Sequence, residues 1–320
     1  MPAAGFVQQS LKRIRIAEGR VGEMKKTWFC TAVLAAAAVF GSGCSAGSLP
    51  GMSGGVYKDA DKYTMGNAKL PADGIESLDL DWLSGEIEIA YHAEDTIIIS
   101  ETSGKTLDEK TTMYYFVDGD TLRVKFAKSG KWNFRDLKKE LQVWLPEGTE
   151  LKKLEADTTS ADVTIREIRA EKLTADTVSG DVLLDGAEVS ESLQVDTTSG
   201  ELTAKISGRT EEVSADTVSG DVSLELSEAG KLKLDSTSGR VNVSMDTPAD
   251  SLSVDTVSGD VVLYLPENAG VTVSWDTVSG SFRSELDTKT DGDDYRLGDG
   301  KKKYSVDTVS GNLKLEKREQ

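Results

Sequence analysis

The stretch Asp176-Thr177-Val178-Ser179-Gly180-Asp181-Val182 decides the fold, because it recurs with little change through the C-terminal half of the chain. Its leading Asp stands at positions 157, 176, 196, 216, 235, 255, 276 and 307, so one unit is about 20 residues long, apart from a last step of 31. A fixed period of this length is typical of a repeat architecture. A degenerate earlier copy lies at residues 81–87.

Apolar and polar residues alternate on both sides of this motif. The residues three and one before the Asp are apolar in every copy, and the residue between them is polar. Another apolar residue stands six after the Asp in every copy. This period of two predicts one half-buried strand before the motif and a second strand after it. The Thr that follows the Asp continues the alternation, so its side chain is predicted to point inward.

A unit with two short strands cannot bury its own apolar face, so the units must stack on one another in register, roughly 4.8 Å apart. The sequence therefore predicts an all-β fold, a β-solenoid (β-helix) of ~20-residue turns. A β-sandwich of separate hairpins is the alternative, but its strands have no reason to share one motif at one spacing.

The Thr-x-Ser-Gly segment between the strands is predicted to form a tight corner in each turn. We expect its Gly to supply a left-handed backbone conformation that a side chain resists. On this interpretation Gly311, in the last copy, lies at the end of the stack. The predicted repeat corners are Asp176 and Gly180, Asp196 and Gly200, Asp216 and Gly220, Asp235 and Gly239, Asp255 and Gly259, Asp276 and Gly280, and Asp307 and Gly311.

The repeated Asp poses an electrostatic problem, because stacked carboxylates about 5 Å apart on an outer face repel one another. Two solutions are open. Bound Ca²⁺ can bridge successive turns, or each Asp can accept hydrogen bonds from the backbone of its own corner. Local capping is favoured, because the acidic residue five positions on is replaced by Arg240 and Ser281 in two copies.

The N-terminal 43 residues read as an upstream extension followed by a secretory signal. Met24-Lys25-Lys26 is basic, residues 27–40 are apolar, and Gly41-Ser42-Gly43-Cys44 is a small-residue box that ends in Cys. This order resembles a bacterial lipoprotein signal, in which Cys44 is lipid-modified and becomes the first mature residue. Position 41 departs from the usual Leu, and plain cleavage or a retained anchor are the alternatives. Met24 is the expected true start.

The mature chain divides into three predicted parts. Residues 44–60, rich in Gly and Ser, are expected to be a flexible tether. Residues 61–150 carry strand patterns without the clean repeat and are expected to form an irregular β cap or first turns, with a helix or a loop at 131–140. Residues 151–320 hold the regular repeats. The insertion at 287–303 is expected to be a solvated polar loop, with Ca²⁺ binding by its acidic residues as the alternative.

Charge and composition narrow the function. The net charge is −18, and removing the six basic and two acidic residues of positions 1–43 leaves a mature net charge of −22, so nucleic acid is an improbable partner. The chain has one His, His92, and two Cys, and only one of the two Cys, Cys44, lies in the mature part. A catalytic carboxylate pair needs two groups in unlike environments, whereas these Asp residues recur in every turn. We therefore expect no enzyme, no cofactor and no metal, with a polysaccharide-acting β-helix enzyme as the alternative.

The corners of the Ser-Gly-Asp-Val type, the stretch Val143-Trp144-Leu145-Pro146-Glu147 and the last strand, residues 306–313, resemble the bacterial putative-adhesin β-solenoid domain family, a domain of unknown function in cell-envelope proteins. The resemblance covers roughly residues 70–316. It implies an envelope location and a role in adhesion or surface sensing, and it supplies no catalytic residues.

We therefore predict a non-catalytic module, lipid-anchored outside the cytoplasm to the cell membrane of a bacterial envelope. It would serve as a scaffold, adhesion or binding module, or as the sensor component of an envelope stress system. Its expected partners are the membrane, through the N-terminal lipid, and an unidentified envelope protein or glycan.

Overall fold

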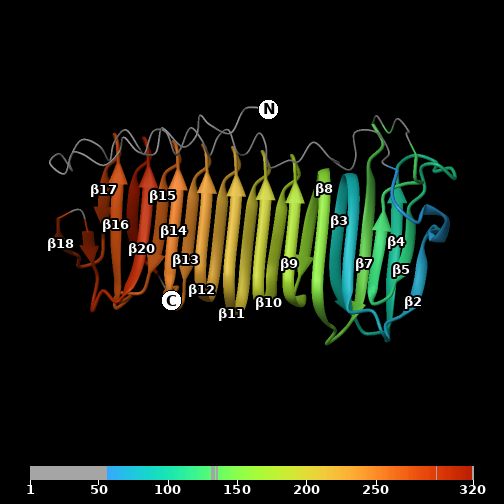
Figure 1. The fold of residues 1–320 in the computed structure, drawn as a ribbon, viewed down its shortest axis with the longest axis horizontal. Helices are drawn as coiled ribbons and strands as arrows, with labels where there is room; N and C mark the ends of the chain where they lie inside the picture. Colours follow the sequence, from blue (N-terminus) through green and yellow to red (C-terminus); the bar gives the residue numbers. More distant parts are fainter. Residues whose placement is uncertain (1–55, 131–133, 135, 293, 319–320) are drawn as a thin grey trace, which may run out of the picture. The chain divides into compact units, whose positions relative to one another are not determined.

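Strands account for nearly all regular structure in the computed structural model, which describes residues 56–130, 134, 136–292 and 294–318. The described residues lie in one compact unit. Its strands lie side by side in one long row (Figure 1). The only helical element among the described residues is the short 3-10 turn η2 (Ala60–Lys62). No helix in the described part of the chain has the length and apolar character needed to cross a bilayer.

The central turns are built from long strands that bend halfway. The second half of each strand leads into a corner, and the first half of the next strand leaves it. We call the ladder of segments that lead into the corners the leading ladder, and the ladder of segments that leave them the trailing ladder. The strands are β8 (Glu150–Arg166), β9 (Arg169–Thr177), β10 (Val182–Thr197), β11 (Leu202–Thr217), β12 (Val222–Ser236), β13 (Val241–Met245), β14 (Ser251–Thr256) and β15 (Val261–Leu265).

Pairing between successive turns is parallel and keeps equivalent residues side by side. Asp176 pairs with Asp196, Asp196 with Asp216, and Asp216 with Asp235. Residues that the alternation assigned to the interior are buried, such as Leu193 and Val195 at 1% exposure each. The Thr after the Asp is also buried in the central turns, with Thr217 at 0%. The chain is therefore a β-solenoid, and the inward position of the Thr is confirmed.

The N-terminal end of the stack is closed by antiparallel strands. β3 (Ser77–His92) pairs with β8 in register, Asp81 opposite Asp157 and Gly85 opposite Ala161, as the degenerate copy predicts. Outside it lie parallel strands β6 (Thr121–Lys125) and β7 (Lys139–Pro146). Antiparallel strands then cover the end: β1 (Thr64–Met65), β2 (Ala68–Pro71), β4 (Thr96–Ser103) and β5 (Tyr114–Asp118).

The turns at the C-terminal end are not stacked in sequence order. The last turn, β20 (Lys302–Thr308) and β21 (Leu313–Lys317), lies between β14/β15 and the turn formed by β16 (Val271–Thr277) and β17 (Phe282–Ser284). Asp307 therefore stands between Asp255 and Asp276. The expectation that Gly311 marks the end of the stack is wrong, because the terminal turn carries Gly280.

Contacts to the preceding turn explain why the last turn takes this place. The Tyr304 hydroxyl donates to the Ala249 carbonyl at 3.1 Å, and the Lys302 ammonium donates to the carbonyl of Pro248. The Arg318 guanidinium pairs with Asp246 at 2.5 Å. These groups belong to segments 244–250 and 302–318, so they favour direct contact between the two turns.

The insertion at 287–303 is not a plain loop. It holds β18 (Lys289–Asp291) and β19 (Asp294–Arg296), which pair with each other, and β19 adds antiparallel to β16. Tyr295 of β19 stacks on Phe282, with 3.6 Å between the ring centroids, and Leu297 is buried. This hairpin covers the apolar end of the stack, which a solenoid would otherwise expose.

Candidate functional site

The corner glycines are required by close approach rather than by a left-handed backbone. None of the predicted corner glycines has a positive φ, whereas Gly186 and Gly208, in the bends between strand halves, do. A Cβ on Gly220 would lie 1.8 Å from the carbonyl oxygen of Gly200, and a Cβ on Gly311 would lie 1.9 Å from that of Gly259. The predicted left-handed corner is therefore wrong, because stacked corners leave no room for a side chain.

The corner backbone is capped by the inward Thr and not by the Asp. The Gly180 N–H donates to the Thr177 hydroxyl at 2.9 Å, and the Gly220 N–H donates to Thr217 at 2.9 Å. The same bond to Thr forms at Gly200, Gly259, Gly280 and Gly311, and at Gly239 the acceptor is the Ser236 hydroxyl. The hypothesis that the repeated Asp caps its own corner is wrong, because this hydroxyl already occupies the position.

The acidic residue five positions after the repeated Asp has a different structural role. Its carboxylate accepts a backbone N–H from the next turn, as Asp162 does from Asp181 at 2.9 Å and Asp181 from Glu201 at 2.8 Å. Asp260 accepts in the same way from Asn312, a residue of the inserted last turn. These side-chain bonds join adjacent turns at the corner, and the sequence analysis did not predict them.

The repeated Asp residues form a column of half-buried carboxylates. One oxygen, Oδ1, is buried and has no hydrogen-bond partner among the described residues in Asp176, Asp196 and Asp216. Burial, with neighbouring column carboxylates as the next cause, raises the pKa of Asp176 to about 7 and that of Asp216 to about 6. Burial likewise raises the pKa of Asp307 to about 6. Ionising these three carboxylates in the folded chain is therefore costly.

Part of the column charge is offset by neighbouring side chains. At the N-terminal end the Lys125 ammonium pairs with Asp81, and further along Lys233 pairs with Asp235. Ser253 donates to Asp255 at 3.4 Å and Ser305 donates to Asp307 at 3.2 Å. In the described part of the chain no group of three or more His, Cys, Asp or Glu side chains is arranged to hold a metal ion.

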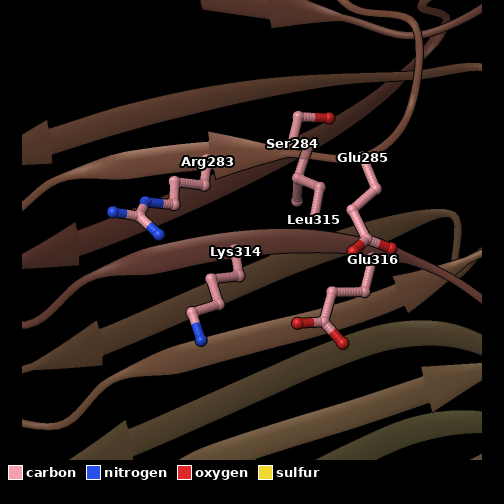
Figure 2. A pocket seen from close by; sticks show the side chains of 6 residues that line it. All are labelled: Arg283, Ser284, Glu285, Lys314, Leu315 and Glu316. Atoms are coloured by element: carbon pink, nitrogen blue, oxygen red, sulfur yellow. The ribbon is translucent and has the colours of Figure 1, made fainter.

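Unpaired charges gather instead on the trailing ladder at its C-terminal end. Arg283 of β17 stands opposite Lys314 of β21, and the next outward residues are Glu285 and Glu316. The four side chains line an open hollow of about 470 Å³, the two cations together and the two carboxylates together (Figure 2). None of the four forms an ion pair within 4 Å among the described residues. We call this set the distal charge cluster.

Like charges directly opposite one another across a sheet are destabilising. The distal charge cluster places cation beside cation and carboxylate beside carboxylate, so neither like-charged pair stabilises the isolated chain. A ligand that brings the opposite charges would relieve both repulsions. A signal for this cluster was present in the sequence, since Arg283 and Lys314 both stand seven residues after the repeated Asp, but the sequence analysis did not compare that position between turns.

A buried ion pair at the N-terminal end was also missed. The Lys139 ammonium is fully buried and lies 2.7 Å from Glu101 Oε2 and 2.8 Å from the Thr111 carbonyl. It stands 4.1 Å from the centroid of the Phe126 ring and 4.7 Å from that of Trp82. Burial lowers the pKa of Lys139 to about 8, although Glu101 acts in the opposite direction. Its partners satisfy it fully, so its role is structural.

Cys44 lies outside the described residues. The predicted corners are all described, and the fold brings them into one continuous column with the order 255, 307, 276 at its end. Asp276, in the terminal turn, is exposed, whereas the column members before it are half-buried.

Comparison with known proteins gave one family and several structures. A family model described as Toastrack DUF4097 matches residues 75–316. Similar solved structures include a putative cell adhesion protein from Clostridium sporogenes ATCC 15579, at 14% identity and TM-score 0.24, covering 80% of this chain and 100% of that chain. A putative adhesin from Bacteroides fragilis NCTC 9343 has 14% identity and TM-score 0.37, with 79% and 97% covered.

A third structure, a putative lipid binding protein from Parabacteroides distasonis ATCC 8503, has 14% identity and TM-score 0.47, with 79% of this chain and 96% of that chain covered. A search of curated proteins returned no match.

Proposed function

This chain belongs to the Toastrack DUF4097 family, and we propose that it is a non-catalytic binding and scaffold module of the bacterial cell envelope, anchored by lipid on Cys44. The family match agrees with the resemblance drawn from the corner motifs. The proposal on function is carried by one observation, the distal charge cluster, in which Arg283, Glu285 and Lys314 are exposed and Glu316 is half-buried, and none of the four forms an ion pair among the described residues.

The carboxylates of the chain support binding better than catalysis. An acid and a base working together need environments that push their pKa values apart. In the Asp column the pKa is raised, and never lowered, in each of Asp157, Asp176, Asp216, Asp255 and Asp307. Equivalent groups in equivalent positions give a structural array rather than a divided pair.

The distal charge cluster is the proposed ligand contact. Its ligand would be an envelope glycan or protein that carries both charge signs, with an anionic group for Arg283 and Lys314 and a cationic group for Glu285 and Glu316. The nine column positions from Asp81 to Asp276 span about 40 Å at ~4.8 Å per turn. A lipid at Cys44 would tether the N-terminal end, so the cluster would be presented at the end away from the membrane.

Cell fractionation tests the anchor. Cys44→Ser should move the protein from the membrane fraction to the soluble fraction, and mass spectrometry of the wild-type N-terminus should find lipid on Cys44. Cys30→Ser, inside the apolar run of the signal, is the matched control and should leave the protein with the membranes. A Cys44→Ser variant that still sediments with membranes would refute the lipid anchor.

A further inference from the structure

The N-terminal end of the solenoid carries most of the exposed large apolar side chains in the described part of the chain. The described residues include four exposed large apolar side chains. Three of them belong to the N-terminal end: Val56 at 78%, Met65 at 49% and Val117 at 37% exposure. The fourth, Val278 at 50%, stands in the corner of the terminal turn at the other end. Figure 1 places β5 and the blue N-terminal segment at the right-hand end of the stack.

Aromatic rings form one patch beside Met65. The ring centroids of Tyr57 and Tyr63 are 4.7 Å apart, and those of Tyr63 and Phe116 are 5.4 Å apart. Met65 continues the same face, since β1 pairs antiparallel with β5 and Met65 stands two residues beyond Tyr63. The Lys62 ammonium lies 5.6 Å from the centroid of the Phe116 ring.

We propose that this patch, Val56, Tyr57, Tyr63, Met65 and Phe116, seats the N-terminal end of the solenoid in the interface of the lipid bilayer. The Tyr57 hydroxyl donates to the Ala127 carbonyl at 3.3 Å, whereas Tyr63, a half-buried ring with a polar tip, suits a boundary that is apolar on one side and wet on the other. A Lys beside such rings can keep its ammonium in the headgroup region while its stem covers apolar surface.

The tether identifies the bilayer as the occupant. Val56 stands 12 positions after Cys44, so it can lie at most about 40 Å from a lipid on Cys44. This proximity gives weak apolar contacts a high effective concentration. The proposal rests on the proposed lipid anchor, and the tether explains why the exposed apolar residues gather at this end.

The test supplies the tether chemically, so that its outcome does not depend on lipidation in the cell. The mature chain, residues 45–320, carries a histidine tag in place of Cys44 and is bound to neutral phosphatidylcholine vesicles that contain nickel-chelating lipid. Met65→Cys is labelled with a polarity-sensitive dye, and Val278→Cys is the matched control at the other end. Brominated phosphatidylcholine then serves as a quencher.

Seating in the interface predicts a blue-shifted and quenched emission at position 65 and an unchanged emission at position 278. Adding Tyr63→Ser to the Met65→Cys protein should reduce the shift, while the thermal melting curve confirms that the variant is folded. Equal emission at the two positions, or a signal at 65 that vesicles leave unchanged, would overturn the proposal. If Cys44→Ser stays in the membrane fraction in cells, the lipid anchor fails, and the vesicle result still decides the seating.

Discussion

Removing one charge from the middle of the Asp column should stabilise the protein, although Asp is the residue that every repeat carries. Asp196 stands between Asp176 and Asp216. Burial is the largest cause of the raised pKa of both neighbours, and the charge of Asp196 is a smaller cause. Asp196→Asn keeps the shape and the bond from Gln194. We expect the variant to be more stable at pH 8 and unchanged at pH 5.

The magnitude follows from the spacing. Two like unit charges about 5 Å apart repel each other by about 1 kcal/mol at the dielectric constant of water, and by about 3 kcal/mol at an effective dielectric constant of ~20. Partial exposure screens the pair, so we expect a gain of about 1–2 kcal/mol in the free energy of unfolding at pH 8. The gain should disappear once the neighbouring carboxylates are protonated.

The pH dependence of the wild type has a definite sign. In the folded chain the pKa values of Asp157, Asp176 and Asp216 are raised to about 6, 7 and 6, above the ordinary value of 3.8 that the unfolded chain has. The folded state therefore holds more protons on these three groups, and their contribution to stability is complete below pH 4 and is lost as the pH rises through 6 and 7. The free energy of unfolding in urea should thus be larger at pH 5 than at pH 8.

The assay is urea unfolding of the lipid-free chain at the two pH values. Asp181→Asn is the matched control, because its carboxylate accepts the Glu201 N–H at 2.8 Å and so has a partner. The control should lose about 1 kcal/mol at pH 8. A destabilised Asp196→Asn, or the same gain at both pH values, would refute the reasoning on the column.

Two further predictions concern packing. Gly220→Ala should cost more than 3 kcal/mol in the free energy of unfolding, since its Cβ would meet a backbone oxygen, whereas Gly104→Ala, with nothing within 4 Å, should stay within ~0.5 kcal/mol; equal effects would contradict the stacked corner. Lys139→Met should cost about 3–5 kcal/mol because it leaves Glu101 buried without its cation. The double variant with Glu101→Gln should recover part of this loss, and a single variant as stable as wild type would show that the pair is not needed.

The repeat, the alternation and the inward Thr could be predicted because they depend on local periodicity. The order of the last two turns could not, since the turns of Asp276 and Asp307 carry the same motif and fit Asp255 equally well in register. Only side chains outside the motif, such as Tyr304 contacting Ala249, distinguish the two orders.

The chemistry of the corner was predicted only in part. Glycine was recognised as necessary at Gly220, but the reason is the neighbouring turn, which a single unit does not contain. The Asp and the Thr were both plausible caps in sequence, and the inward position of Thr217 next to its corner N–H decided for the Thr. Lys139 lies in an irregular region without a repeat to align, so nothing in the sequence marked it as buried.

The central claim is that the chain binds a ligand through the distal charge cluster without changing it chemically. Binding of the lipid-free chain to a panel of purified envelope glycans and envelope proteins tests this directly, with the mass of each bound ligand measured before and after incubation. We expect a ligand that binds wild type, keeps its mass, and binds Arg283→Ala/Lys314→Ala at least about tenfold more weakly, a loss of about 1.4 kcal/mol. The control Lys172→Ala/Lys231→Ala, at cations paired with Glu191 and Glu212, should bind as wild type does. A ligand that is shortened during incubation, or that binds the cluster variant as tightly as wild type, would contradict the claim.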